Sequence, residues 1–246
     1  MKLALGLLLS NGFPVPAPFV LGFADLLSTL LSGRLNPSLP APLQVHDLRI
    51  VNCQGFPVDT ARNDVCRTVL TDPDVTHLLF LDADMRHPSD LAHRLLRHQQ
   101  PLVTARYQMR KPPFHTCAMR KAGPGPHDFK SIEEQSGLVP VDRAGAGCLL
   151  IAREVLEDIR ARVGDDWFRY QTGPNGLRTV SEDMWFFEQA IACGYQPYCD
   201  LDTVCTHVAS FEVEPGWNQQ YREVLQPKTS VEPARKVIDF TPAVAQ

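Results

Sequence analysis

The stretch "LLFLDADMRHP", residues 78–88, joins four apolar residues to two aspartates, Asp82 and Asp84. A short apolar run bounded by polar residues predicts a buried β-strand. Residues i and i+2 of a strand share a face, so the two carboxylates are expected to lie side by side at the strand's end. Because like charges repel, this arrangement predicts a cation between them.

The chain around this stretch alternates between strand-like and helix-like segments. Further strands are predicted at 3–10, 46–52 and 101–107, with 76–82 as the strand that ends in the aspartates. Helices are predicted at 19–33, 61–70, 88–99 and 179–195. Asp59 or Thr60 is expected to cap the helix at 61–70, and Pro88 or Ser89 is expected to start the helix at 88–99. Gly33 and Gly194 are expected to end the helices at 19–33 and 179–195. This alternation predicts an α/β fold, with a mostly parallel central sheet and helices on both faces.

Composition indicates a soluble globular chain. Its 246 residues suit one large or two small domains, and no apolar run approaches the roughly 18 residues that span a membrane. The segment "MKLALGLLLS" resembles a signal peptide, but a buried first strand explains it equally well and is preferred. Seven cysteines without a CxxC pair favour a reducing compartment, the cytoplasm. An alternative zinc site would use Cys193, Cys199, Cys205 and His207, although their spacing does not match zinc fingers.

Charge is distributed unevenly along the chain, which carries a net charge of −4. No acidic residue occurs between Asp90 and Asp128. That interval contains seven basic residues: Arg94, Arg97, Arg106, Arg110, Lys111, Arg120 and Lys121. A one-signed block predicts either a solvated basic face or a partner that carries phosphates.

Several short motifs follow one another in a recognisable order. They are "ARN" (61–63), "FLDADM" (80–85), "GAGCLLIARE" (145–154), "SEDMWFFEQAIACGY" (181–195) and His207. Together they resemble the GT-A glycosyltransferases, nucleotide-sugar-dependent enzymes with a Rossmann-like sheet, and in particular small stand-alone enzymes of bacteria and bacteriophages. The resemblance implies a glycosyltransferase domain at 1–211, with a nucleotide-sugar half at about 1–105 and an acceptor half at about 106–211. Residues 212–246 are predicted to be a polar tail.

The resemblance also implies a donor site. Arg62 and Asn63 would hold the nucleotide and its diphosphate, and the small residues Gly145, Ala146 and Gly147 would lie beside the donor sugar. The segment Asp82, Ala83 and Asp84, completed by His207, would bind Mn²⁺ or Mg²⁺ together with the donor, expected to be a UDP-sugar. The acidic residue that usually meets the nucleotide base cannot be identified on the first strand. Asp25 lies too far into the following helix, and Asn11 is a substitute.

Catalysis is assigned by the same resemblance. Asp183 would take the proton from the acceptor hydroxyl, with Glu182 as the alternative base, and sugar transfer would proceed with inversion. A helix N-terminus favours the ionised form of such an acid. A surface helix would also place acids in its first turn, so the structural interpretation stays open.

The acceptor is predicted from the basic block. Basic and aromatic residues that can grip a phosphate backbone or stack on a base are interleaved there: Arg106, Tyr107, Arg110, Lys111, Phe114, Arg120 and Lys121. The leading acceptor is therefore a 5-hydroxymethyl pyrimidine in phage DNA, which an enzyme would take out of the stack. Protein, lipid phosphate or another sugar are alternative acceptors. Two other classes stay open: a haloacid-dehalogenase-type phosphatase, and a non-catalytic module that binds sugar nucleotides. The sequence does not predict an oligomeric state.

Overall fold

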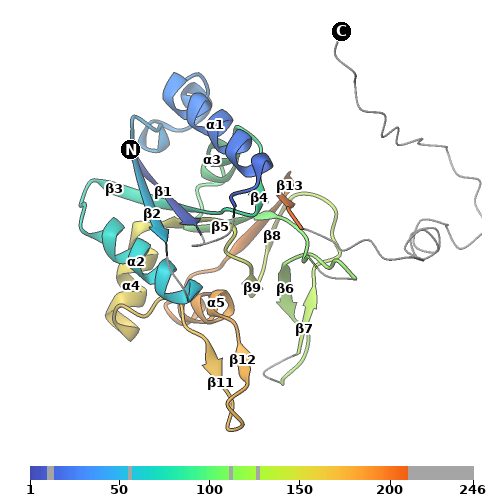
Figure 1. The fold of residues 1–246 in the computed structure, drawn as a ribbon. Helices are drawn as coiled ribbons and strands as arrows, with labels where there is room; N and C mark the ends of the chain where they lie inside the picture. Colours follow the sequence, from blue (N-terminus) through green and yellow to red (C-terminus); the bar gives the residue numbers. More distant parts are fainter. Residues whose placement is uncertain (10–13, 55–56, 111–112, 126–127, 210–246) are drawn as a thin grey trace, which may run out of the picture. The chain divides into compact units, whose positions relative to one another are not determined.

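A seven-stranded sheet organises the described part of the chain, residues 1–9, 14–54, 57–110, 113–125 and 128–209 of a computed structural model (Figure 1). The strand order is β2-β1-β3-β10-β5-β13-β8. The strands are β1 (Lys2–Leu9), β2 (Asp47–Gln54), β3 (Val75–Asp82), β5 (Leu102–Arg106), β8 (Leu138–Pro140), β10 (Cys148–Ala152) and β13 (Tyr198–Val204). Strands β10 and β8 run antiparallel to their neighbours, and the other five strands share one direction. The predicted α/β class and the mostly parallel sheet are confirmed.

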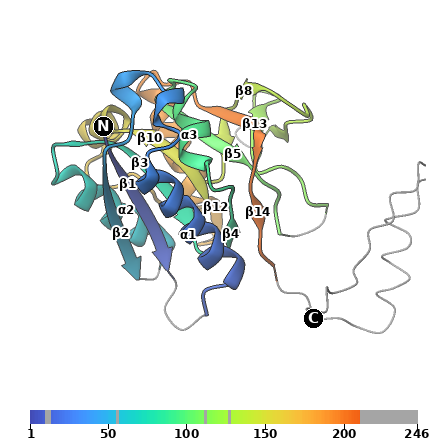
Figure 2. The same cartoon turned by 90° about the horizontal axis from the view of Figure 1, so that it is seen from above.

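Helices cover both faces of the sheet, as predicted. Side chains of β1 alternate between two apolar clusters, with Leu3 and Leu5 in one and Ala4 and Leu8 in the other. Helices α1 and α3 pack on the first cluster, whereas α2, α4 and α5 pack on the second (Figures 1 and 2). Because both faces are buried, the strands read as continuous apolar runs in the sequence.

The helices begin and end close to their predicted positions, with two corrections. Their bounds are α1 (Ala17–Ser32), α2 (Val58–Leu70), α3 (Leu91–Leu96), α4 (Arg153–Val163) and α5 (Glu182–Ala192). Gly33 closes α1 in the left-handed conformation with φ 62°. Helix α2 starts after Pro57, upstream of Asp59 and Thr60, so neither caps it. Helix α3 starts at Leu91 because residues 88–91 form a separate turn, in which Leu91 N–H donates to the Pro88 carbonyl.

Short strands outside the main sheet form the surface on which the site is built. Strands β6 (Ala118–Lys121), β7 (Phe129–Ser131) and β9 (Arg143–Ala144) make a three-stranded sheet, so part of the irregular middle of the chain is a hairpin. Strands β11 (Gln171–Thr172) and β12 (Arg178–Val180) form a second hairpin that precedes α5. Strands β4 (Met85–Arg86) and β14 (Thr206–His207) pair with each other.

Residues 1–209 form one compact unit. Residues 2–9 are the strand β1 inside the central sheet, with buried side chains along most of its length. Among the described residues, no helix has the length and apolar character needed to cross a lipid bilayer. The predicted donor and acceptor halves stay a prediction, and the predicted tail at 212–246 lies outside the described residues, as does Asn11.

Candidate functional site

The two aspartates of "LDAD" do not share a strand face, in contrast to the prediction from their spacing. Strand β3 ends at Asp82, and Ala83 and Asp84 form the turn that leads into β4. Each carboxylate has a cation of its own. Asp82 Oδ2 lies 2.9 Å from Arg62 Nη2, and Asp84 Oδ2 lies 2.8 Å from Arg110 Nη1. Two side-chain cations thus balance the pair of like charges that the sequence places together.

His207 reaches Asp84 from the far end of the described chain. Strand β14 pairs with β4 so that His207 lies opposite Met85, and the Val208 N–H donates to the Asp84 carbonyl. The imidazole Nε2 then stands 3.4 Å from Asp84 Oδ2. Burial acts to raise the pKa of Asp84, but the hydrogen bond and charge of His207 and the charge of Arg110 outweigh it and lower that pKa.

The tautomer of His207 follows from its second ring nitrogen. Nδ1 lies 3.0 Å from the backbone carbonyl of Gln108, which can only accept, so Nδ1 carries the proton. In the neutral ring, the Nε2 lone pair would then face the Asp84 carboxylate. Two acceptor atoms face each other stably when a proton or a metal cation lies between them. The Asp84–His207 pair is therefore suited to holding a cation.

Few side chains at this position could bind a metal ion, but they suit a hard cation that substrate also coordinates. Among the described residues, no group of three or more His, Cys, Asp and Glu side chains could hold a metal ion, which includes the alternative zinc set. Asp82 Oδ1 is a buried carboxylate oxygen without a hydrogen-bond partner in the same part of the chain. Mg²⁺ is usually bound by one or two carboxylates together with substrate phosphates and waters. Asp84 and His207, with Asp82 beside them, match that pattern.

Arg62 and Asn63 are buried inside the protein, and their predicted contact with the donor stays a prediction. Asn63 exchanges two hydrogen bonds with the backbone of Phe168, from its amide to the carbonyl at 2.8 Å and from the Phe168 N–H to its oxygen at 2.9 Å. Arg62 is 3% exposed. Its guanidinium donates to Asp82 and to the Ala146 carbonyl, and its Nε lies 3.7 Å from Glu182 Oε1.

Arg62 therefore links the end of β3 to the start of α5. Its guanidinium carbon lies 5.2 Å from the centre of the Phe80 ring and 5.6 Å from that of Phe168. Burial opposes the charged form of Arg62, but Asp82 and Glu182 outweigh it and raise the pKa of the guanidinium. A buried cation in an apolar shell needs such carboxylate partners to remain stable.

Asp183 and Glu182 stand at the start of α5 in different environments. Asp183 Oδ1 accepts hydrogen bonds from the Ser181 hydroxyl and the Met184 N–H, and its side chain is partly exposed. Glu182 is buried, beside Arg62 and the Tyr170 hydroxyl. Burial raises the pKa of both carboxyls, and the mutual charge of the pair adds to the effect on Glu182. Of the two, Asp183 is the more accessible to an acceptor hydroxyl.

The glycines of "GAG" make room for a side chain of the protein. A Cβ on Gly145 would lie 2.0 Å from the Tyr107 hydroxyl, and a Cβ on Gly147 would meet that hydroxyl at 3.3 Å and Asp82 Oδ2 at 3.4 Å. The Gly147 N–H donates to the Tyr107 hydroxyl at 3.0 Å. Tyr107 is 5% exposed and packs edge-on against His207, so it is not available to stack on a base.

The basic block is largely neutralised by acids that lie outside it in the sequence. Its ion pairs are Arg94 with Asp90, Arg97 with Asp200, Arg110 with Asp84 and Arg120 with Glu134. Arg106 donates to Gln135, and Lys121 donates to the Gly125 carbonyl. Phe114 is 45% exposed and open to a partner, whereas Lys111 lies outside the described residues. These ion pairs reduce the net positive charge of the block, which sequence distance does not reveal, and the predicted phosphate-bearing partner stays a prediction.

Some residues of the site were not identified from the sequence. Ser181 and Tyr170 contact the two acids of α5, and the backbone carbonyl of Gln108 sets the tautomer of His207. A serine directly before a helix is a recognisable signal for a cap. The other contacts involve common residue types in unremarkable sequence positions.

Comparison with known proteins supports the fold class. No protein-family model and no curated protein sequence matches the chain. Among solved structures, the fold is similar to that of GalNAc-T7 with UDP, GalNAc and Mn²⁺, with a TM-score of 0.54 and 10% identity over 91% of this chain. The match covers 48% of the GalNAc-T7 chain, so this protein spans about half its length. The protein A197 from STIV is also similar, at 15% identity, over 87% of this chain and 98% of that chain, with a TM-score of 0.46.

The similarity to GalNAc-T7 shows a GT-A-like α/β fold, as the sequence motifs led us to expect.

Proposed function

We propose that this protein is a metal-dependent glycosyltransferase that moves a sugar from a nucleotide-sugar donor to an acceptor hydroxyl, with inversion at the anomeric carbon. The observation that carries the proposal is the meeting of Asp84 and His207, 3.4 Å apart, at the carboxyl end of β3. Open α/β sheets bind their ligands at that edge. The fold similarity to GalNAc-T7, whose structure holds UDP, GalNAc and Mn²⁺, is consistent with this assignment.

The donor site is assigned to the residues around that pair. Asp84 and His207 would hold Mn²⁺ or Mg²⁺. Asp82 would help to orient the bound ligands through Oδ1, which has no hydrogen-bond partner among the described residues. When bound, the metal acts as a Lewis acid that stabilises the charge of the departing diphosphate. Arg110 is half-exposed and contacts Asp84, so it can turn from that carboxylate toward the diphosphate. Arg62 and Asn63 are buried and would hold the neighbouring segments of the site in position.

Asp183 is assigned as the general base. Its raised pKa brings the carboxylate closer to the range in which a base works near neutral pH. The Ser181 hydroxyl and the Met184 N–H fix one oxygen, which leaves the other free to receive the proton of the acceptor hydroxyl. A base on the acceptor side accords with direct displacement of the nucleotide and thus with inversion. Glu182 is the weaker candidate because Arg62 and Tyr170 already engage it.

The acceptor assignment is less favourable to DNA than the sequence suggested. Four cations of the basic block are paired with acids, and Tyr107 is buried. A 5-hydroxymethyl pyrimidine therefore stays a prediction that rests on the basic and aromatic residues of the sequence. The phosphatase alternative would need Asp82 as its nucleophile, and the ion pair with Arg62 occupies one oxygen of that carboxylate.

The function is tested with a panel of nucleotide sugars. Thermal unfolding is measured with each donor, with and without Mn²⁺, because a ligand of the folded state raises the melting temperature. We expect a rise for a UDP-sugar that depends on Mn²⁺, together with slow release of UDP. Absence of any shift across all donors at millimolar concentration would contradict the proposed function.

A further inference from the structure

A cavity lies between the two hairpins that flank α5. It has a volume of about 510 Å³, within the range of sites for small ligands. The residues that line it are Lys121, Phe129, Arg143, Gln171, Thr179, Val180 and Glu188. They come from β6, β7 and β9 on one side and from β11, β12 and α5 on the other, two parts of the surface that are distinct in Figure 1.

The strand register explains which basic residues face this cavity. Lys121 pairs with Phe129, and Arg120 pairs with Lys130, across β6 and β7. Successive residues of a strand point to opposite faces, so Lys121 and Phe129 share the inner face while Arg120 points outward and pairs with Glu134. Adjacent members of the basic block are thereby directed to different surfaces.

Two cations converge on the Phe129 ring at the cavity wall. The Arg143 guanidinium carbon lies 3.7 Å from the ring centre and Lys121 Nζ lies 4.9 Å from it. Glu188 is the acid among the lining residues, and it forms an ion pair with Arg143. Lys121 Nζ donates to the neutral Gly125 carbonyl. The cavity walls therefore carry one positive charge in excess.

Two further acids of this surface, Asp142 and Asp128, keep their negative charge, but no ion pair joins either of them to Lys121 among the described residues. The Lys121 N–H donates to Asp142 Oδ2, and the Gly125 N–H donates to Asp128 Oδ2. Neither acid belongs to the cavity lining. The exposed Lys121 ammonium lines the cavity together with Gln171, whose side-chain amide can donate a hydrogen bond to an anion, and Thr179, whose hydroxyl donates to the Gln171 carbonyl.

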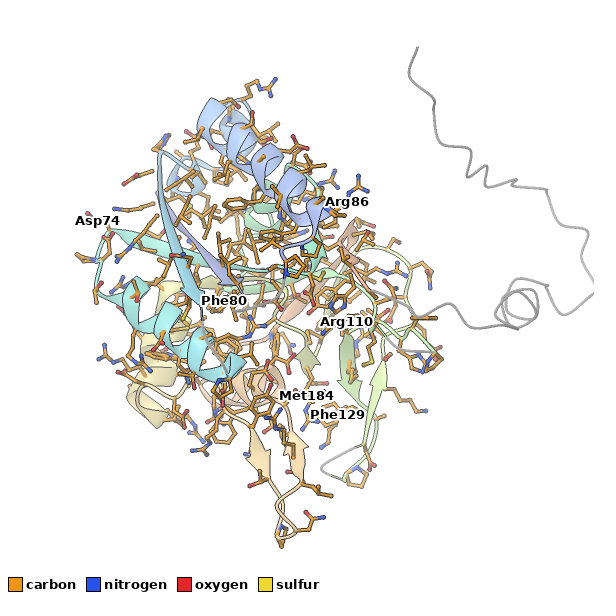
Figure 3. The ribbon with its side chains drawn as sticks, viewed as in Figure 1. Asp74, Phe80, Arg86, Arg110, Phe129 and Met184 are labelled. Atoms are coloured by element: carbon orange, nitrogen blue, oxygen red, sulfur yellow. The ribbon has the colours of Figure 1, made fainter. Side chains whose placement is uncertain are left out.

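The cavity also adjoins the proposed base. Arg143 contacts Met184, the residue after Asp183, and Met184 and Phe129 are both labelled in the lower half of Figure 3. Glu188 follows Asp183 by five residues on α5, which is a rise of roughly 7.5 Å along the helix and a rotation of about 140° around it. An acceptor held in the cavity would therefore have to extend along and around α5 to bring its other end to the carboxylate of Asp183.

We infer that this cavity binds the acceptor and selects one that carries a phosphate or carboxylate group at the end away from its reacting hydroxyl. The identification of the bound molecule as the acceptor rests on the proposed function, whereas anion binding in the cavity does not depend on it. Sugar phosphates and sugar acids have the size and the chemistry that the cavity fits. A nucleic acid is less suited, since one ammonium among the lining residues is in excess and the outward Arg120 is already paired.

The inference is tested by binding of defined probes, with UDP and Mn²⁺ present to occupy the donor side. Glucose 6-phosphate and glucuronic acid are titrated against glucose, which has the same ring without charge, and against inorganic phosphate and a short single-stranded oligonucleotide. We expect both charged sugars to bind and glucose to bind at least tenfold more weakly. The variant Lys121→Gln should weaken the charged sugars roughly tenfold, the value of one charge-assisted hydrogen bond. The matched control Arg120→Gln, one residue away on the outer face, should leave binding unchanged.

The outcomes separate this inference from the proposed function. Equal binding of glucose and the charged sugars, or an equal loss in both variants, would overturn the inference even if UDP and Mn²⁺ bind as proposed. Binding of the oligonucleotide alone, lost in both variants, would replace it with a nucleic-acid surface. A charged sugar that binds through Lys121 while UDP does not bind would retain the anion site and refute the glycosyltransferase.

Discussion

The central sheet has an amino-terminal edge, where its parallel strands begin, and a carboxyl edge, where they end, and the two differ in how their polar groups are hydrogen-bonded. Figure 3 shows Asp74 at one end of β3 and Arg86 and Arg110 toward the other. The amino-terminal edge has the larger of the two cavities, about 540 Å³, lined by residues such as His77 and Arg153. Arg153 is fully engaged there, since it donates to the carbonyls of Leu70, Asp72 and Val75.

The carboxyl edge has groups that the protein leaves partly unsatisfied. Asp82 has one buried oxygen without a partner among the described residues, and the nearby Asp84 carboxylate is contacted by both Arg110 and His207. Unsatisfied buried polar atoms cost stability, so their retention points to a ligand. The comparison teaches that cavity size alone does not mark the candidate site. Variants at the carboxyl edge should lower activity, and variants at the amino edge should change stability.

The largest effect is expected from Asp84→Ala. Loss of this carboxylate removes one of the two protein ligands proposed for the metal, and we expect donor hydrolysis and transfer to fall below detection. Folding should be retained, because the side chain is partly exposed and its partner Arg110 is half-exposed. Metal binding alone is measured by the free Mn²⁺ signal in electron paramagnetic resonance. Unchanged Mn²⁺ binding and activity that persists in a chelator would show that the metal assignment is wrong.

The next effect is expected from Asp183→Asn. The amide keeps the size of the carboxylate but cannot accept a proton, so transfer should fall by roughly two to four orders of magnitude while donor binding persists. In the wild type, the raised pKa of Asp183 should place the acid limb of the kcat/KM profile above pH 3.8, the ordinary value for an aspartate. Single-turnover transfer measured against pH checks both points. If Glu182→Gln loses transfer and Asp183→Asn retains it, Glu182 is the base.

A third variant, Arg62→Met, tests the support behind the site. It leaves the carboxylates of Asp82 and Glu182 buried without their cation, and breaking such a pair costs about 3–5 kcal/mol of unfolding free energy. Urea unfolding measures this loss, and a second change, Asp82→Asn, should recover part of it. The control is Arg67→Met on the same helix, where the half-exposed pair with Asp64 contributes about 0–1 kcal/mol. Equal losses in the two variants would refute the role of Arg62.

The sequence predicted the sheet better than the site, for physical reasons. Apolar runs and helix periodicity arise from local burial, so the strands up to residue 107 were placed correctly. The antiparallel insertion of β10 between β3 and β5 depends on contacts across the chain, which no local pattern contains. The same limit explains why the burial of Arg62 and Tyr107 was not predicted, since it is produced by segments distant in sequence. It also explains the basic block, since Glu134 and Asp200 neutralise it from outside.

The smallest effect is expected at the amino edge, from His77→Gln. Burial lowers the pKa of His77 to about 4 from its usual 6.5, and the charge of the chain's amino terminus adds to the shift. Between these two values the unfolded chain binds more protons than the folded chain, so the free energy of unfolding declines as the pH falls from about 6.5 to 4. The shift corresponds to at most about 3 kcal/mol.

Glutamine cannot titrate, so the variant should show a flatter decline across this window and should match the wild type in transfer at neutral pH. Urea unfolding at pH 4.5 and 7.5 gives the slope. A loss of transfer in this variant would show that the amino edge takes part in function and would overturn the division between the two edges.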